Sequence, residues 1–349
     1  MFKKFLKRAL AIGLMIFTLS ISGVACKTVS DDEKLQNLLQ TKRELLFDEN
    51  GNFKVLICAD VHANGTLPEN VKSNLETLVE RENPNLVIFT GDNTICNSKK
   101  SLKEALNSMV GLIEQKGIAW CHVYGNHDHE GGLIKSVMQP VYESYDYCLS
   151  KHGDKSLSGV GNYVLPIYKS GDSEPKALVW CLDSGNYISE IDKLKSEYNA
   201  DFEGHRNSGY DYIKSDQIAW YEESSRLIEN KFGKKINSLM AFHIPLQESY
   251  YAWVDRENWE WTGSKNEEVC ASGINSGLFN KILSRGDVKA IVNGHDHVND
   301  YMVNYHGVKL CYSPNFSTLT YHSESVMGAR VFNINESGEI STYVSYLYK

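Results

Sequence analysis

The chain has 349 residues, 42% of them hydrophobic and 23% charged, which is an ordinary globular composition with room for one large α/β domain or two smaller ones. The net charge of −8 argues against a nucleic-acid-binding surface, since basic residues cluster only at the extreme N-terminus. A phosphate-bearing substrate is still compatible with this charge, because bound metal ions would set the local field at a site.

The first 26 residues have the order of a secretory signal peptide. Four basic residues precede an apolar run over residues 9–21, which is too short to span a membrane comfortably, and a small-residue stretch ends at Ala25. Cys26 follows the expected cleavage site, as the lipidated cysteine does in bacterial lipoproteins. We therefore expect an exported protein, either secreted or attached to the cell-surface membrane through lipidated Cys26; a retained N-terminal anchor is the alternative. Residues 27–44 would form a polar tether, and residues 45–349 a single catalytic domain.

The eight cysteines do not predict a disulfide framework. Without Cys26 seven remain, an odd number with no C-x-x-C pair. Cys58, Cys121 and Cys181 lie within strand-like runs, where a free cysteine behaves as a small core hydrophobe. We expect buried free thiols.

From residue 53 onward, the pattern repeats strand, polar cluster and helix. Apolar, β-rich runs predict strands at residues 55–58, 86–89, 119–124, 163–168, 177–182, 239–242 and 290–292. Helical periodicity predicts helices at residues 67–82, 101–115, 216–231 and 276–283, and a fifth within 134–149 that Pro140 should start or kink. This alternation favours a layered α/β fold.

Two hairpins and two interrupting segments complete the predicted domain. The hairpins cover residues 301–312 and 329–348, with turns at 305–307 and 336–338. The segments at residues 184–212 and 247–273 interrupt the repeat. The second is rich in aromatic residues and is either a packed loop or a substrate-facing lid, in which Trp253 would contact substrate.

Five polar clusters carry the expected chemistry, and most of them directly follow a predicted strand. Asp60 and His62 are two residues apart on an extended segment, so their side chains point to the same face and can share one ion; His295 and His297 repeat this spacing. Mixed nitrogen and oxygen donors suit Zn, Mn or Fe. Seven donors are too many for one ion and fit two, provided that one carboxylate bridges. The expected ligands are Asp60, His62, Asp92 as the bridge, Asn126, His243, His295 and His297.

The third cluster also contains a histidine with no expected metal role. His127 could protonate a leaving oxygen or stabilise a transferring phosphoryl group, with Asp128 fixing its tautomer. Both are candidate catalytic residues. His129 is close enough in sequence to line the same pocket and is a candidate substrate contact.

The order D-x-H, G-D-N, G-N-H-D, single His and G-H-D-H resembles that of the calcineurin-like metallophosphoesterases, over residues 53–319. The stretches 242–245 and 294–300 look like the branch related to purple acid phosphatases. Ile95 stands where true purple acid phosphatases carry a metal-binding tyrosine, so the ferric-tyrosinate colour is not expected.

The resemblance implies a four-layer α/β/β/α sandwich, with two mixed sheets flanked by helices, and a division of the ligands between two ions. One ion would take Asp60, His62, Asp92 and His297, and the other Asp92, Asn126, His243 and His295, with His127 as the catalytic histidine. The cofactors would be two divalent or trivalent transition-metal ions (Fe, Mn or Zn), whose identity stays open.

The expected function is hydrolysis of phosphate monoesters by direct attack of a metal-bridging hydroxide, without a covalent phosphoenzyme. The substrate would be a small phosphate ester or a phosphoprotein. A phosphodiesterase or nucleotidase with the same site is the close alternative. A catalytically silent surface lipoprotein that binds a ligand is a third reading, which the complete ligand set disfavours.

Overall fold

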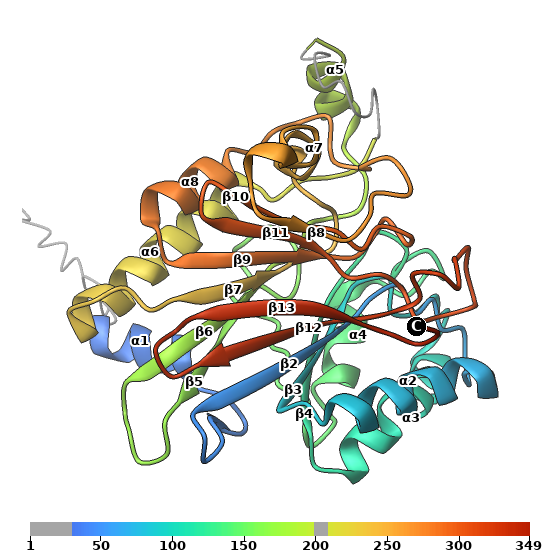
Figure 1. Cartoon of the computed structure of the whole chain (residues 1–349), viewed down its shortest axis with the longest axis horizontal. Coiled ribbons are helices and arrows are strands. Elements are labelled where there is room, and N and C mark those ends of the chain that lie inside the picture. Colours follow the sequence, from blue (N-terminus) through green and yellow to red (C-terminus); the bar gives the residue numbers. More distant parts are fainter. Residues whose placement is uncertain (1–29, 199–208) are drawn as a thin grey trace, which may run out of the picture.

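Two β-sheets form the centre of the molecule (Figure 1). They belong to a computed structural model that describes residues 30–198 and 209–349. The large sheet has eight strands in the order β1 (Leu45–Leu46), β5 (Tyr163–Tyr168), β6 (Pro175–Cys181), β7 (Ser238–Ala241), β9 (Val288–Asn293), β11 (Val308–Tyr312), β10 (Met302–Tyr305) and β8 (Trp261–Thr262). The small sheet has five, in the order β13 (Ile340–Tyr346), β12 (Gly328–Asn335), β2 (Asn52–Cys58), β3 (Leu86–Thr90) and β4 (Ala119–Val123).

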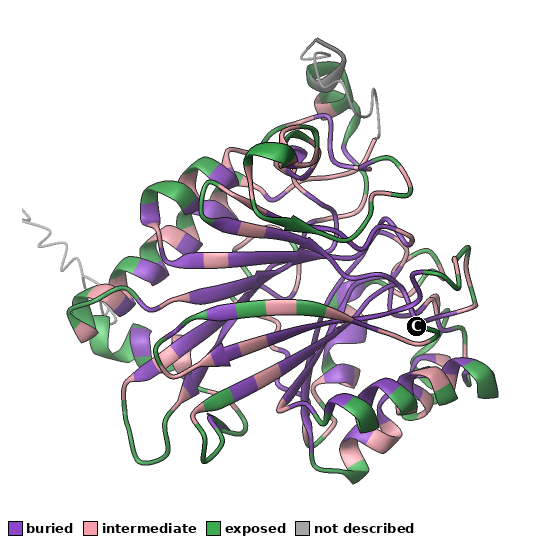
Figure 2. Ribbon diagram, viewed as in Figure 1, coloured by how far each residue is buried: buried purple, intermediate pink, exposed green. Residues whose placement is uncertain are grey.

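Alternate residues of each central strand face opposite layers. On β2, Val55 and Ile57 pack against the large sheet, whereas Leu56 and Cys58 pack against helices. Because side chains alternate along a strand, a strand covered on both faces reads as a continuous apolar run. The central strands are accordingly buried along most of their length, and the helices expose their outer faces (Figure 2).

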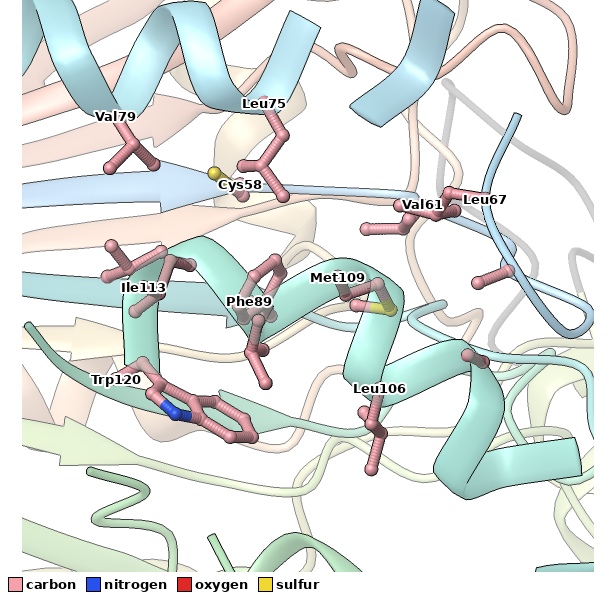
Figure 3. Packing of buried hydrophobic residues seen from close by; sticks show 14 of the residues in the cluster. Cys58, Val61, Leu67, Leu75, Val79, Phe89, Leu106, Met109, Ile113 and Trp120 are labelled. Carbon is pink, nitrogen blue, oxygen red and sulfur yellow. The ribbon is translucent and has the colours of Figure 1, made fainter. Parts of the chain in front are cut away.

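Helices cover the outer face of each sheet. The small sheet is covered by α2 (Glu69–Glu82), α3 (Lys99–Gln115) and α4 (Lys135–Tyr142). In Figure 3, Leu75 and Val79 of α2 and Met109 and Ile113 of α3 point toward Phe89 of β3. The large sheet packs against α1 (Asp31–Leu39), α6 (Ser215–Phe232), α7 (Gln247–Val254) and α8 (Leu278–Arg285). The predicted four-layer α/β/β/α sandwich is confirmed.

The predicted elements fall close to the observed ones. The seven predicted strands and both hairpins form, and β10–β11 and β12–β13 pair antiparallel. The helix predicted within residues 134–149 is shorter, because α4 ends at Tyr142, and Pro140 lies inside it. The short helix α5 (Glu190–Tyr198) and the 3₁₀ helix at Arg256–Asn258 lie in the two interrupting segments.

The predicted polar tether is partly wrong. Asp31–Leu39 form helix α1, which begins with the Ser30 side chain accepting a hydrogen bond from Glu33 N, and Leu35 is buried against the large-sheet layer. The expected signal peptide and Cys26 lie outside the described residues. Among the residues that are described, no helix is long and apolar enough to cross a membrane.

The described cysteines are free thiols, as expected. Of the seven in the described ranges, only Cys270 is partly exposed and the other six are buried. Burial raises the pKa of the Cys148 thiol to about 12, so this group stays protonated and unreactive at neutral pH.

Candidate metal centre

The seven expected metal ligands converge from both sheets. Those from the small sheet follow the carboxyl ends of the parallel strands β2, β3 and β4, and those from the large sheet follow β7 and β9, which are also parallel to each other. The carboxyl ends of parallel strands meet at one edge of a sheet, where α/β proteins commonly bind ligands. The five clusters therefore form one site.

The donor atoms fall into two groups that share one carboxylate. Asp60, His62, Asp92 and His297 offer donor atoms that all lie within 4.8 Å of one another, and so do Asp92, His243 and His295. Asp92 Oδ2 lies 3.6 Å from His62 Nε2 and 3.2 Å from His243 Nε2. This arrangement suits a carboxylate that bridges two ions.

Several buried nitrogen and oxygen atoms that could bind a metal ion at this centre have no hydrogen-bond partner. They include His62 Nε2, Asp92 Oδ2 and Asn126 Oδ1. A buried polar atom without a partner costs about 1–3 kcal/mol, so native structures seldom leave one unexplained. Metal ions would satisfy all three atoms, and the residues present therefore fit a pair of bound ions.

Backbone carbonyls orient two of the imidazoles. His243 Nδ1–H donates to Thr90 O at 2.8 Å, and His297 Nδ1–H donates to Tyr321 O at 3.0 Å. Donation from Nδ1 leaves the Nε2 lone pair of each ring free for a metal ion, which is the usual arrangement of ligating histidines. The ring of Tyr321 also stacks on that of His297, with centroids 4.1 Å apart.

Backbone amides hold the two carboxylates in a similar way. Asp60 Oδ1 and Oδ2 both lie 3.1 Å from His295 N, which donates to them. Asp92 Oδ1 accepts from His127 N at 2.8 Å, and this bond leaves Asp92 Oδ2 free to bridge.

The ligands also adopt a rare backbone conformation. Asp60, His62, Asp92 and His295 have φ values of 57°, 53°, 51° and 76°, in the left-handed region that non-glycine residues seldom occupy. Such strain is concentrated at functional sites, where the surrounding structure holds it in place. Here it turns each side chain toward the common centre immediately after a strand ends.

The ionisation of these groups reflects burial and mutual attraction. Burial lowers the pKa of His62 and of His297 to about 4, so both rings are neutral at pH 7, the form that binds a metal ion. Burial opposes charging of His243 as well, but the attraction of Asp92 outweighs it and raises the His243 pKa to about 9, so a metal ion that binds Nε2 would displace a proton from it. In turn, the His243 imidazolium holds the pKa of Asp92 below its usual range although burial acts in the opposite direction.

His127 lies at the same centre, but Asp128 does not fix its tautomer, and that prediction is wrong. The Asp128 carboxylate accepts hydrogen bonds from Asn93 N at 3.0 Å, Thr94 N at 2.9 Å and Gly125 N at 2.7 Å. Asp128 therefore joins the loops after β3 and β4. The partner of His127 Nδ1 is instead Glu130 Oε2, at 2.6 Å.

The metal centre opens into a cleft of about 750 Å³. Its lining includes the metal-centre residues His62, Asp92, His127, His295 and His297 together with Asn64, Thr66, Pro68, Ile95, Glu130, Tyr210, Cys270, Asp296, Leu319, Thr320 and Tyr321. Glu130 and Tyr210 were missed from the sequence, although the i+3 spacing of Glu130 from His127 was a usable signal.

The two predicted substrate contacts do not line this cleft. His129 is absent from its lining. Trp253 lies in α7 and packs against Tyr301, with ring centroids 4.8 Å apart, as part of the large-sheet core. The aromatic segment is thus a packed element and not a substrate-facing lid at this residue.

Known proteins match the chain over most of its length. Residues 53–299 match the calcineurin-like phosphoesterase family. The chain is 31% identical to probable inactive purple acid phosphatase 29 of Arabidopsis thaliana, over 82% of this chain and 77% of that protein. It is 30% identical to phosphatase DCR2 of Saccharomyces cerevisiae, over 72% of this chain and 45% of that protein.

A solved structure shows the same fold. A dimetal phosphatase from Danio rerio superposes with a TM-score of 0.51 at 13% identity, covering 84% of this chain and 98% of that one. The family match and the relative named as a purple acid phosphatase agree with the order of the motifs. The solved structure agrees with the four-layer fold. The chain belongs to the calcineurin-like phosphoesterase family.

Proposed function

We propose that this protein is an active dinuclear-metal-dependent phosphatase that hydrolyses phosphate monoesters. The observation that carries the proposal is Asp92 Oδ2, a buried carboxylate oxygen set between His62 Nε2 and His243 Nε2, with His127 Nε2 at 4.0 Å. A carboxylate placed to bridge two ions, beside a histidine that can transfer a proton, suits direct hydrolysis of a phosphate ester.

The ions and the side chains would have separate tasks. When bound, a pair of transition-metal ions supplies a hydroxide nucleophile near neutral pH and offsets the charge of the phosphoryl oxygens. His62, His243 and His297, fixed by their environment, would hold the ions. His127 reaches the centre through Nε2, while its Nδ1 is engaged by Glu130, so a proton on Nε2 is placed for delivery to the leaving oxygen.

The names of the relatives bear on activity in two ways. The Arabidopsis and Saccharomyces relatives are both phosphatases by name, which supports a monoester substrate. The word inactive in the Arabidopsis name describes that protein and not the present chain. In the present chain, all seven expected ligands and His127 are present, and six of the ligands form the two overlapping donor groups. A complete donor set supports catalysis.

The test is a panel of phosphate monoesters and diesters, assayed with purified protein reconstituted with Fe, Mn or Zn. We expect monoesters to be the better substrates with at least one metal. Asp92→Asn should lose bound metal and at least about 10³-fold in kcat, since it removes the bridging charge. Asp146→Asn, an exposed carboxylate, is the matched control. Preference for diesters would replace the monoester assignment, and full activity of Asp92→Asn would exclude the dinuclear mechanism.

We further propose export, with a small phosphate ester or a phosphoprotein outside the cytoplasm as substrate. The support is the basic, apolar and small-residue order before Cys26. If Cys26 is lipidated, the protein will partition with membranes, and Cys26→Ala will release it. A soluble cytoplasmic wild-type protein would contradict the proposal.

A further inference from the structure

Glu130 contacts the expected catalytic histidine through one ring nitrogen, while the other nitrogen faces the metal ligands. Glu130 Oε2 lies 2.6 Å from His127 Nδ1, and His127 Nε2 lies 4.0 Å from Asp92 Oδ2. The rings of His127 and His62 are 5.2 Å apart. The hydrogen bond to Glu130 therefore sets which edge of the His127 ring points to the reacting centre.

Glu130 is itself held in place by a neighbouring segment. The Tyr187 hydroxyl donates to Glu130 Oε1 at 3.1 Å, and the same hydroxyl accepts from Asn126 Nδ2 at 3.4 Å. Glu130 N donates to His127 O at 3.0 Å, so a tight turn places the two side chains side by side. Both carboxylate oxygens of Glu130 thus have a partner, and Tyr187 links Glu130 to the expected ligand Asn126.

No other described carboxylate bonds to His127 Nδ1. Asp128, the neighbour in sequence, is fully buried and accepts from three backbone amides. Asp92, the other carboxylate near the ring, faces Nε2. Glu130 is therefore the group that can orient the ring, and it lines the cleft that substrate must enter.

We propose that Glu130 is the positioning residue of His127, and that Tyr187 orients Glu130 in turn; this inference rests on the proposed function. As the oxygen of a hydroxide forms its bond to phosphorus and the bond from phosphorus to the leaving oxygen breaks, the proton on His127 Nε2 passes to that leaving oxygen, which departs as an alcohol. The Nδ1 proton stays on the ring, where it is hydrogen-bonded to Glu130, and solvent then restores the proton on Nε2. The Glu130 carboxylate holds the ring through Nδ1 and prevents it from rotating, so that Nε2 keeps facing the centre.

The first test is the dependence of kcat on the leaving group. Glu130→Ala should lower kcat by about 10–100-fold for phenyl and alkyl phosphates, whose leaving oxygens need a proton, and by less than about 3-fold for p-nitrophenyl phosphate. Tyr187→Phe should show the same trend with a smaller loss. Metal content should stay at the wild-type value in both variants. Glu104→Ala, on the exposed side of α3, is the matched control and should leave all rates unchanged.

The second test does not depend on activity. In metal-free protein labelled with ¹⁵N-histidine, we expect His127 Nδ1 to be protonated and hydrogen-bonded, with the signal assigned through His127→Asn. This signal should lose its hydrogen-bonded shift in Glu130→Ala and keep it in Glu104→Ala.

The outcomes separate the two proposals. Equal losses of kcat for good and poor leaving groups, or an unchanged His127 signal in Glu130→Ala, would overturn the positioning role. If wild-type protein hydrolyses no phosphate ester with any metal, the proposed function fails, and the ¹⁵N signal alone then decides whether Glu130 orients His127.

Discussion

A methyl group on Gly125 would lie 2.1 Å from Asp92 Oδ1 and 2.4 Å from Asp92 N. Gly91 is similarly confined, since a Cβ there would lie 2.4 Å from His243 Nδ1. Both glycines belong to polar clusters that supply expected ligands. Their lack of a side chain lets the loops after β3, β4 and β7 approach closely enough for the donor atoms to share one centre.

Gly125→Ala should therefore disturb Asp92 directly. We expect a loss of about 1–3 kcal/mol in the free energy of unfolding, typical of overpacking, together with weaker metal binding. Urea denaturation and metal analysis would measure both. Gly111→Ala is the control: it lies within α3 with nothing within 4 Å of the added Cβ, and it should stabilise the protein by up to about 1 kcal/mol. Unchanged metal affinity in Gly125→Ala would contradict the close-approach argument.

At the level of elements, helix α7 belongs to the core of the large-sheet layer. Ala252 is fully buried, and the Trp253 ring packs on Tyr301 and, at 5.6 Å between centroids, on Trp261. Arg256 lies over the Trp253 ring, with its Cζ 4.4 Å from the centroid. The aromatic residues of this segment thus stabilise the fold around β10.

Trp253→Ala tests this assignment. Because the indole is partly buried, we expect a loss of about 2–3 kcal/mol in unfolding free energy, somewhat less than for a fully buried tryptophan. The KM for phosphate esters should stay within a factor of about 2 of wild type, which corresponds to about 0.4 kcal/mol. Val254→Ala, at an exposed position on the same helix, should change stability by less than about 0.5 kcal/mol. A large rise in KM for Trp253→Ala would restore a substrate-binding role.

The sequence predicted the central strands, and the position of polar clusters at their ends, well because each signal is local. A strand covered on both faces must be apolar throughout, and a ligand at its carboxyl end follows at once in sequence. The aromatic segment carried no such signal, since the same residues can line a cleft or fill a core. Only the contact between Trp253 and Tyr301 decides between these readings.

Asp128 and Glu130 show, within one turn of the chain, the same limit of prediction from residue types. Asp128 is adjacent to His127 in sequence, but its side chain turns back to amides from two loops. The turn closed by Glu130 N and His127 O brings the residue at i+3 beside the ring instead. Side-chain direction within a turn depends on backbone dihedral angles, which residue types alone do not specify.

For the whole molecule, buried histidines make stability sensitive to acid. Outside the metal centre, His122 of β4 is buried, and burial lowers its pKa from 6.5 to about 3. Between pH 3 and pH 6.5, the imidazole of His122 is therefore protonated in the unfolded chain and neutral in the folded chain. The contribution of His122 to the unfolding free energy should therefore be fully retained above pH 6.5 and fall by about 1.4 kcal/mol per pH unit below it.

His122→Phe isolates this contribution. Phenylalanine keeps the stack on Tyr142, where the centroids are 3.6 Å apart, and removes the buried Nε2 that has no hydrogen-bond partner. Urea denaturation from pH 7.5 to 4.5 would give the unfolding free energies of wild type and variant. We expect the difference between them to shift by about 2–3 kcal/mol in favour of the variant at low pH. A pH-independent difference would show that His122 does not contribute to acid unfolding.

The division of the ligands between the two sheets has a consequence for how the protein matures. The small sheet alone lacks His297, and the large sheet alone lacks Asp92, so neither donor group is complete until the sheets have docked. Uptake of the proposed ion pair would thereby depend on docking of the two sheets, since a chain with only one sheet formed would lack part of each donor group. The compartment in which folding finishes, through its own supply of iron, manganese or zinc, would then select the ions that the protein binds.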